Sequence, residues 1–143
     1  MLIVLGPLPV ASRVGKRKGE IITRRFCPLS PNARMDWRAK RPYTVAARTE
    51  ARLTALDQIN RIQDWKPFER VVVWPTIYVP AKRNFFDDDN ALACLKPYFD
   101  GLADAGIVKN DRHMKRMTPE FRVDAERPRI ELRIEKVSSS SSA

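Results

Sequence analysis

Three consecutive aspartates, Asp87, Asp88 and Asp89, are the residues whose types and spacing most favour chemistry in this chain. They stand between a strand-like run and a helix-like run, and another carboxylate, Asp111, follows the predicted helix end at Gly106. Clustered like charges cost energy unless a cation or a proton intervenes. Carboxylates gathered on a structured turn are also the ligands that Mg²⁺ prefers. The cluster therefore predicts a divalent-metal site.

The spacing within the cluster suggests which acids act together. Asp87 and Asp89 are two residues apart, so on an extended segment their side chains point the same way and Asp88 points away. A second interpretation stays open, because Asp and Asn are preferred N-caps and acids gain from the dipole at a helix N-terminus. One cap needs one such residue, whereas D-D-D-N supplies four.

An apolar stripe at three- and four-residue spacing predicts the helix that follows the cluster. Its members are Leu92, Leu95, Phe99 and Leu102. Pro97 lacks a backbone donor and disfavours helical geometry at Lys96, so we expect a kink or two short helices there. An unbroken helix would place Lys96 on the same side as Asp89, about 10 Å along the axis.

The charge balance points to a polyanionic partner. The chain carries 27 Lys and Arg against 17 Asp and Glu, a formal net charge of +10. Residues 13–48 hold eleven of the basic residues against two acids. The chain lacks the long basic amphipathic helix that would indicate binding to an anionic membrane. For such a basic chain, nucleic acid is the commoner partner. We therefore predict nucleic-acid binding and no membrane association.

The cysteine and histidine content excludes two kinds of site. Cys27 and Cys94 form no C-x-x-C pair, and His113 is the one histidine, so neither a zinc site nor a disulfide framework is supported. The first ten residues are apolar but too short to span a bilayer and contain two prolines. We expect a cytoplasmic protein without a small-molecule cofactor.

The segment 31–42 is basic and bracketed by prolines, which predicts a loop that offers guanidinium groups to phosphates and an indole for stacking. Its candidate DNA-binding residues are Arg34, Trp37, Arg38, Lys40 and Arg41. Trp37 has a second interpretation as a core residue, since large aromatics are usually buried. Lys82 and Arg83, directly before the acidic cluster, are further candidates.

The remaining patterns predict an α/β (α+β) protein with a small mixed sheet of about four strands and two main helices. Strands are expected over 20–29, 69–80 and 128–137, with Pro75 placing the second at an edge or a bulge. A helix of about five turns is expected from Thr44 to about residue 62. Residues 1–19 read as a flexible basic arm, 20–137 as a single domain and 138–143 as a disordered serine-rich tail.

The motifs D-D-D-N, L-K-x-x-x-D-G-L-A-D-A-G and K-N-D resemble the acidic core of the RusA-type Holliday junction resolvases, or crossover junction endodeoxyribonucleases. P-L-S-P-N-A-R-M-D-W-R is similar to that family's opening strand and loop, and P-R-I-E-L-R-I-E to its last strand. The resemblance extends from about residue 20 to residue 137. Two departures stand out: the gap between Asn90 and Lys96 is three residues longer, and Asn110-Asp111 replaces a pair of aspartates.

This resemblance implies a homodimeric RusA-like fold that binds four-way branched DNA, with Mg²⁺ or Mn²⁺ as the cofactor. It places the metal-binding catalytic carboxylates at Asp87, Asp89 and Asp111, and the essential lysine at Lys96. Such an enzyme would resolve junctions by paired symmetric cuts in recombination and repair, in a bacterial cell or its phage.

Two alternatives to a junction nuclease remain open at this point. One is a non-catalytic module for branched DNA, in which the acids merely cap a helix. The other is a nuclease that acts on flaps or forks. Phe85 and Phe86, just before the acids, are either an apolar wedge at a junction centre or part of the core.

Overall fold

The computed structural model describes residues 1–137, and a five-stranded mixed sheet forms their centre. The strands are β1 (Leu2–Leu5), β2 (Ala11–Arg17), β3 (Glu20–Phe26), β4 (Val71–Val79), β5 (Met114–Arg116), β6 (Glu120–Val123) and β7 (Arg129–Lys136). The helices are α1 (Trp37–Ile59), α2 (Asp88–Cys94) and α3 (Lys96–Asp104), with 3₁₀ turns η1 (Lys82–Asn84) and η2 (Asp111–His113). The tail predicted at 138–143 lies outside the described residues.

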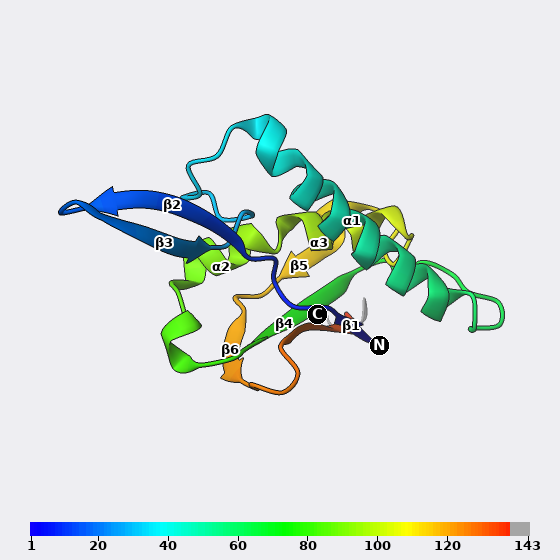
Figure 1. Ribbon diagram of the computed structural model, residues 1–143. Coiled ribbons are helices and arrows are strands. Elements are labelled where there is room, and N and C mark those ends of the chain that lie inside the picture. The colour runs from blue at the N-terminus through cyan, green and yellow to red at the C-terminus, as the bar shows by residue number, and fades with distance from the viewer. Residues whose placement is uncertain (138–143) are drawn as a thin grey trace.

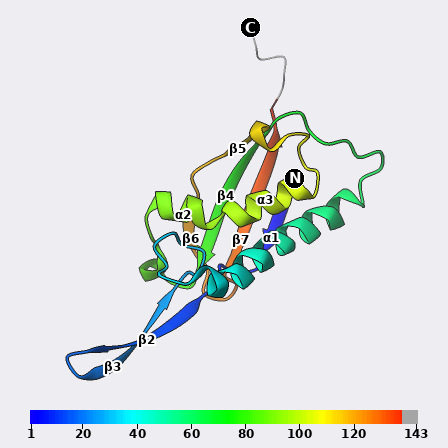
Figure 2. The ribbon, with the colours of Figure 1, turned by 90° about the horizontal axis from the view of Figure 1, so that it is seen from above.

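The sheet has the order β1-β7-β4-β5, with β6 also paired to β4 (Figures 1 and 2). β7 runs antiparallel to both β1 and β4, whereas β5 and β6 run parallel to β4. The predicted mixed α+β class with two main helices is therefore confirmed. The sheet contains one strand more than the four expected, and its members differ: β1 belongs to it, whereas β3, the strand expected over 20–29, pairs only with β2 in a separate sheet.

Strand β4 is central, so the edge position inferred from Pro75 is wrong. β7 pairs with one side of β4, while β5 pairs with Val71–Val73 and β6 with Thr76–Val79 on the other. The carbonyl oxygens of Val73 and Val79 accept hydrogen bonds from Met117 and Asp124, which follow β5 and β6. Backbone polar groups of every second residue in a strand point to the same side, so the backbone nitrogen of Pro75 faces β5 and β6 as well. Its missing N–H thus falls in the gap between two short strands, where it leaves no ladder bond unmade.

Helices α1 and α3 cover one face of the sheet and pack closely on each other (Figure 2). The buried face of α1 presents Ala47, Ala51 and Ala55. On α3, a Cβ added at Gly101 would lie 2.3 Å from the Arg48 carbonyl oxygen and 2.8 Å from Ala51 Cβ. Small residues on both helices therefore permit this close approach. No helix within residues 1–137 combines the length and apolarity needed to cross a bilayer.

Helix α1 begins seven residues before the Thr44 that was predicted as its N-cap. Asp36 is the N-cap instead, and its side chain accepts a bond from the Arg38 N–H at 3.2 Å. Pro42 lies inside the helix, where its ring fixes a φ that suits the helix and removes only one donor. The loop predicted over 31–42 is therefore wrong for residues 37–42.

The two short helices expected around Pro97 are confirmed. α2 ends at Cys94 and α3 begins at Lys96, with Leu95 between them still in helical geometry. Gly106 ends the second helix as predicted, with φ +86°. The N–H groups of Gly106 and Ile107 return to the carbonyls of Ala103 and Leu102, which closes the helix end with a Schellman motif.

The first nineteen residues are not the loose arm that the sequence predicted. Leu2–Leu5 forms strand β1, which pairs with β7 and buries Ile3 and Leu5. After a proline-containing link, β2 and β3 form a separate hairpin that projects from the body (Figures 1 and 2). Pro7 and Pro9 lie in the link between β1 and β2, so they interrupt neither strand. The strand expected near 20–29 is confirmed as β3.

Candidate active site and nucleic-acid interface

The acidic turn, defined as Asp87, Asp88 and Asp89, follows the carboxyl end of β4. Asp87 is the N-cap of α2: its Oδ1 accepts the Asn90 backbone N–H and its Oδ2 accepts the Asn90 side-chain amide, each at 2.9 Å. Asp88 and Asp89 lie in the first helical turn. Since the helix begins at Asp88, the extended geometry expected to align Asp87 with Asp89 is not formed.

All three carboxylates of the acidic turn are exposed. Within residues 1–137 none of them forms an ion pair, although the chain carries many basic side chains. They lie beside one another at a helix N-terminus, where the helix dipole offsets part of their mutual repulsion. The turn is therefore open to a cation from solution.

The structure does not bring Asp111 to the acidic turn of the same chain. Asp111 begins η2, directly before β5, and the register pairs Met114 of β5 with Val71, the first residue of β4. The acidic turn follows the other end of β4, a strand of nine residues and so about 25 Å long. Among residues 1–137, no group of three His, Cys, Asp or Glu side chains is arranged to hold a metal ion.

Lys96, the predicted essential lysine, stands at the first residue of α3. Its ammonium lies 2.9 Å from Asp100 Oδ2, one helical turn further on. Asp100 also lies 3.8 Å from the guanidinium of Arg116. Lys96 is thus engaged with α3 in this structure, while its side chain remains largely in solvent.

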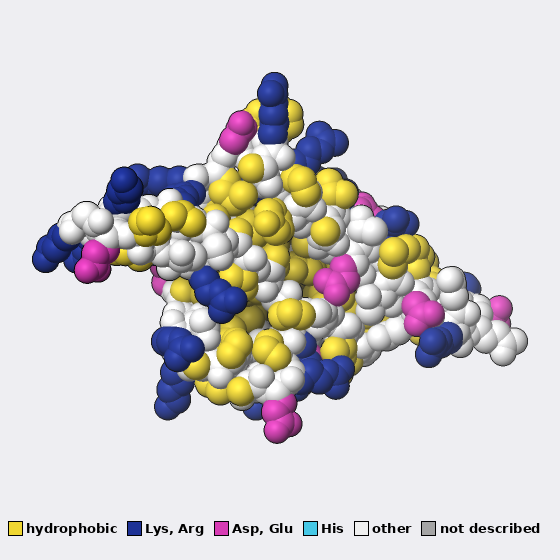
Figure 3. Space-filling view, in the orientation of Figure 1, with side chains coloured by type: hydrophobic (Ala, Val, Ile, Leu, Met, Phe, Trp, Pro, Cys, Tyr) yellow, Lys and Arg dark blue, Asp and Glu magenta, His cyan; other side chains and the backbone are white. Residues whose placement is uncertain are grey.

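A basic cleft of about 890 Å³ opens next to the acidic turn. Five arginines line it, together with Phe85, Phe86 and Asn90 and without an acidic residue among the lining side chains. The arginines are Arg13, Arg24, Arg25, Arg34 and Arg83. Asn90 joins the two features, because its side chain also binds Asp87. Figure 3 shows Lys and Arg side chains along the projecting hairpin and on the body below it.

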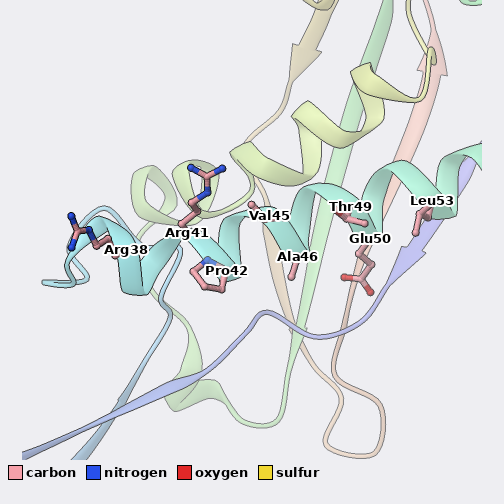
Figure 4. A pocket seen from close by; sticks show the side chains of 8 residues that line it. All are labelled: Arg38, Arg41, Pro42, Val45, Ala46, Thr49, Glu50 and Leu53. Atoms are coloured by element: carbon pink, nitrogen blue, oxygen red, sulfur yellow. The ribbon is translucent and has the colours of Figure 1, made fainter.

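The predicted DNA-binding residues divide between two surfaces. Arg34, Arg83, Phe85 and Phe86 line the cleft, whereas Arg38 and Arg41 line a separate surface groove along α1 (Figure 4). Lys82 is exposed in η1. Lys40 donates to the Ser30 carbonyl at 3.1 Å and so ties α1 to the preceding loop. The basic loop expected over 31–42 is therefore not a single surface.

The aromatic residues separate clearly by exposure. Trp37 is 64% exposed, with the Arg38 guanidinium 5.5 Å from its ring, so it does not fold back onto the core. Phe86 packs against the core, and Phe85 remains 41% exposed although both rings contact Phe121. Phe85 thus keeps a free ring surface, whereas Phe86 belongs to the packing around the core.

Sequence reasoning missed Arg24 and Arg25 of β3 and the place of Arg13 at the cleft. Arg13 donates to the Arg34 carbonyl and lies 5.1 Å from the Phe26 ring. The signal that could have revealed them is Gly19, at φ +82° beside Lys18 at φ +53°, because two left-handed residues make the two-residue turn of a hairpin. The glycines had suggested an irregular arm.

Cys27 and Cys94 connect the cleft to α2 as a pair of free cysteines. A hydrogen bond between the two thiols lowers the pKa of Cys27, and the charge of Lys40 acts in the same direction. The same hydrogen bond and burial raise the pKa of Cys94. Cys94 is part of the buried core, and Cys27 packs against it.

No family model matches the chain. It is 42% identical over 82 residues to an uncharacterized protein of Xylella fastidiosa, strain Temecula1. The match covers 54% of this chain and 50% of that relative. The chain therefore spans about half the length of the relative it matches.

Proposed function

We propose that the protein is a metal-dependent endonuclease that cuts branched DNA, with the four-way junction as its substrate. The observation that carries the proposal is the adjacency of an arginine-lined cleft and a turn of three carboxylates without an ion pair in the described residues. The cleft offers positive charge to phosphates, and the turn offers oxygen ligands to Mg²⁺ or Mn²⁺. A phosphodiester in the cleft would thus lie next to the residues suited to its hydrolysis.

A bound divalent cation would lower the pKa of a water molecule and offset charge on the leaving oxygen. Asp89 and Asp87 are the residues of the turn proposed to hold it. The guanidinium groups of Arg34 and Arg83 would hold the neighbouring phosphates by charge-assisted hydrogen bonds. Lys96 is two helical turns from Asp89 along the α2–α3 path, and it would have to leave Asp100 to reach the phosphate.

Asp111 can join this site only from a second copy of the chain. It lies at the opposite end of β4 from the acidic turn, so a two-fold axis across the middle of the strand would bring the two ends together. A dimer of this kind would form two equivalent sites. Two such sites would match the two symmetric cuts of a four-way junction.

A second candidate function is a branched-DNA-binding module without catalysis. The observation in its favour is the N-cap geometry of Asp87, whose two oxygens both accept bonds from Asn90. This function requires the cleft and assigns the acidic turn to folding alone. The two candidates differ in what neutralising Asp89 does to cleavage.

The deciding experiment is cleavage of a labelled four-way junction beside a matched linear duplex, in Mg²⁺ or in chelator. For Asp89→Asn we expect cleavage to fall by about a hundredfold or more, while junction binding in chelator stays within about twofold. Asp64→Asn, an exposed acid beyond the far end of α1, is the matched control and should cut normally. Tight junction binding with no cleavage by the wild type in any divalent metal would establish the binding module instead.

A further inference from the structure

The hairpin formed by β2 and β3 stands outside the main sheet. Its strands bond to each other along their whole length, from Ala11 opposite Phe26 to Arg17 opposite Glu20, and they form a sheet of their own. In both ribbon views it projects beyond the body (Figures 1 and 2), and residues at its base line the cleft. A two-stranded ribbon with no covering layer is marginally stable alone, which suggests that it completes its contacts elsewhere.

Its charge indicates what it contacts. The segment 11–26 carries six basic side chains against the single acid Glu20, and its pairing places Arg13 directly opposite Arg24. The six are Arg13, Lys16, Arg17, Lys18, Arg24 and Arg25. Like charges in opposite positions of a ribbon destabilise it. A polyanion laid along the hairpin would remove that repulsion.

Apolar side chains on the hairpin are also left in water. Val14 is 69% exposed and Ile21 72% exposed, among the most exposed large apolar residues of the described chain. Val14 pairs with Thr23, and Ile21 pairs with Lys16. Because Val14 and Lys16 are two residues apart on one strand, Val14, Lys16 and Ile21 lie on the same face of the ribbon. A face that mixes cations with aliphatic groups suits the phosphates, sugars and base edges along a nucleic-acid groove.

The base of the hairpin is fixed in place. Arg13 donates to the Arg34 carbonyl and packs on the Phe26 ring, and Phe26, Arg24 and Arg25 line the basic cleft. The positive charge thus continues from the hairpin tip into the cleft and ends at the acidic turn. A strand of seven residues is about 20 Å long. The hairpin could therefore follow a groove over more than half of one helical turn of B-DNA, which is ~34 Å along the axis.

We propose that the β2–β3 hairpin is a DNA-binding arm that lies as a two-stranded ribbon in the groove of a duplex arm. The inference rests on the proposed function in taking DNA as the partner. The major groove of B-DNA admits a ribbon of this width. At this surface a polyanion is favoured over a second copy of the chain, because residues 11–26 carry six basic side chains against one acid.

The test measures binding to a labelled duplex and a labelled four-way junction in chelator, over a range of salt concentrations. The variant is Lys16→Gln/Arg17→Gln/Lys18→Asn, with Asn at position 18 because it tolerates the left-handed φ found there. The matched control is Arg61→Gln/Lys66→Gln/Arg70→Gln, three exposed residues past the far end of α1. Both variants remove three positive charges, and the control also removes the exposed ion pair of Arg61 with Asp57, which contributes little to stability.

We expect the hairpin variant to lose affinity at least tenfold at about 0.1 M salt and the control to lose less than about threefold. The slope of log K against log salt should fall by about 2 to 3 in the hairpin variant, about 0.9 for each phosphate contact removed. DNA should also slow trypsin cleavage of the wild type after Arg17 and Lys18. Equal losses in the two variants, or unslowed cleavage at the tip, would overturn the inference.

The outcomes separate this inference from the nuclease proposal. Junction cleavage that depends on Mg²⁺ but not on the hairpin would overturn the inference alone. Hairpin-dependent DNA binding by a wild type that never cuts would overturn the nuclease and leave the binding arm. A wild type that binds neither DNA at any salt concentration would overturn both.

Discussion

Two groups of carboxylates lie along the α2–α3 helical path, and they have opposite surroundings. On α3, Asp104 accepts two bonds from the Arg48 guanidinium, at 2.5 and 2.8 Å, and Asp100 lies 2.9 Å from the Lys96 ammonium. On α2, the three carboxylates of the acidic turn have no cationic partner within the described residues. In the first group, Asp104 links α3 to α1 and Asp100 pairs within α3, whereas the second group faces solvent.

The difference teaches which acids are available for chemistry. With 27 basic residues in the chain, an ion pair for each acid of the turn would be easy to supply. Arginines do stand nearby, but they line the cleft and do not contact these carboxylates. Because the arginines and the carboxylates are close in space but unpaired within the described residues, the arginines can bind a phosphate while the carboxylates bind a metal ion. This contrast supports a folding role for the α3 acids, and it is the basis on which we propose that the acidic turn binds the metal ion.

The largest expected effect comes from breaking the α3 side of this comparison. Gly101→Ala would place a Cβ 2.3 Å from the Arg48 carbonyl oxygen, so α1 and α3 must separate. We expect a loss of about 2 to 3 kcal/mol in the free energy of unfolding, measured by urea denaturation. Gly15→Ala in the hairpin meets nothing within 4 Å and is the control. Equal stability of the two variants would contradict the close helix packing.

The second effect distinguishes two roles of Asp87, which is the N-cap of α2 and also a candidate metal ligand. Asp87→Ala removes the side chain that accepts the Asn90 N–H and should cost about 1 kcal/mol in thermal or urea unfolding. Asp87→Asn keeps a good N-cap and should unfold like the wild type, within a few tenths of a kcal/mol. Both should cut a junction poorly. Full activity in Asp87→Asn would limit Asp87 to capping.

The smallest effect concerns the ion pair between Arg48 and Asp104. The guanidinium holds the pKa of Asp104 below its ordinary value. A lowered folded pKa contributes stability above the unfolded pKa, and that stability is lost as the pH falls through the folded value. Because both side chains are partly exposed, Asp104→Asn should cost no more than about 0.5 to 1 kcal/mol near neutral pH.

In acid, below the ordinary aspartate pKa of about 3.9, the difference between Asp104→Asn and the wild type should shrink toward zero. Urea midpoints measured across this range give the comparison. Asp88→Asn, in the acidic turn, removes no ion pair with any residue of 1–137 and is the matched control. A gap between Asp104→Asn and the wild type that stays constant into acid would show that the ion pair is not its source.

The sequence predicted those elements whose residues repeat with a clear period. β7 alternates Ile130, Leu132 and Ile134 with charged residues, and all three of these side chains are buried as expected. Of the hairpin, the sequence predicted β3 but missed β2 and the pairing between them, because β2 buries neither face and no apolar alternation marks it as a strand. β1 was not predicted, because Pro7 and Pro9 suggested that the whole N-terminal segment was irregular, although both lie after the strand.

The candidate site was predictable only where it is local. The acidic turn and the helix break at Pro97 follow from neighbouring residues, and the structure has both. The place of Asp111 depends on the parallel pairing of β5 with β4, a contact between residues about forty positions apart. Nothing in the local sequence specifies that register, so the separation of Asp111 from Asp87 could not be foreseen. The same holds for the cleft, which is lined by residues within 7–13, 24–34 and 78–90 and by Pro128.

The most direct test of the central claim is Mn²⁺ binding to the protein at equilibrium, followed by electron paramagnetic resonance of the free ion. We predict saturable binding by the wild type that Asp89→Asn abolishes and that Asp104→Asn leaves unchanged. Because Asp111 is proposed to act from a second copy, Asp111→Asn should weaken binding as well. Equal Mn²⁺ uptake by the wild type and Asp89→Asn would contradict the claim that the acidic turn holds the metal.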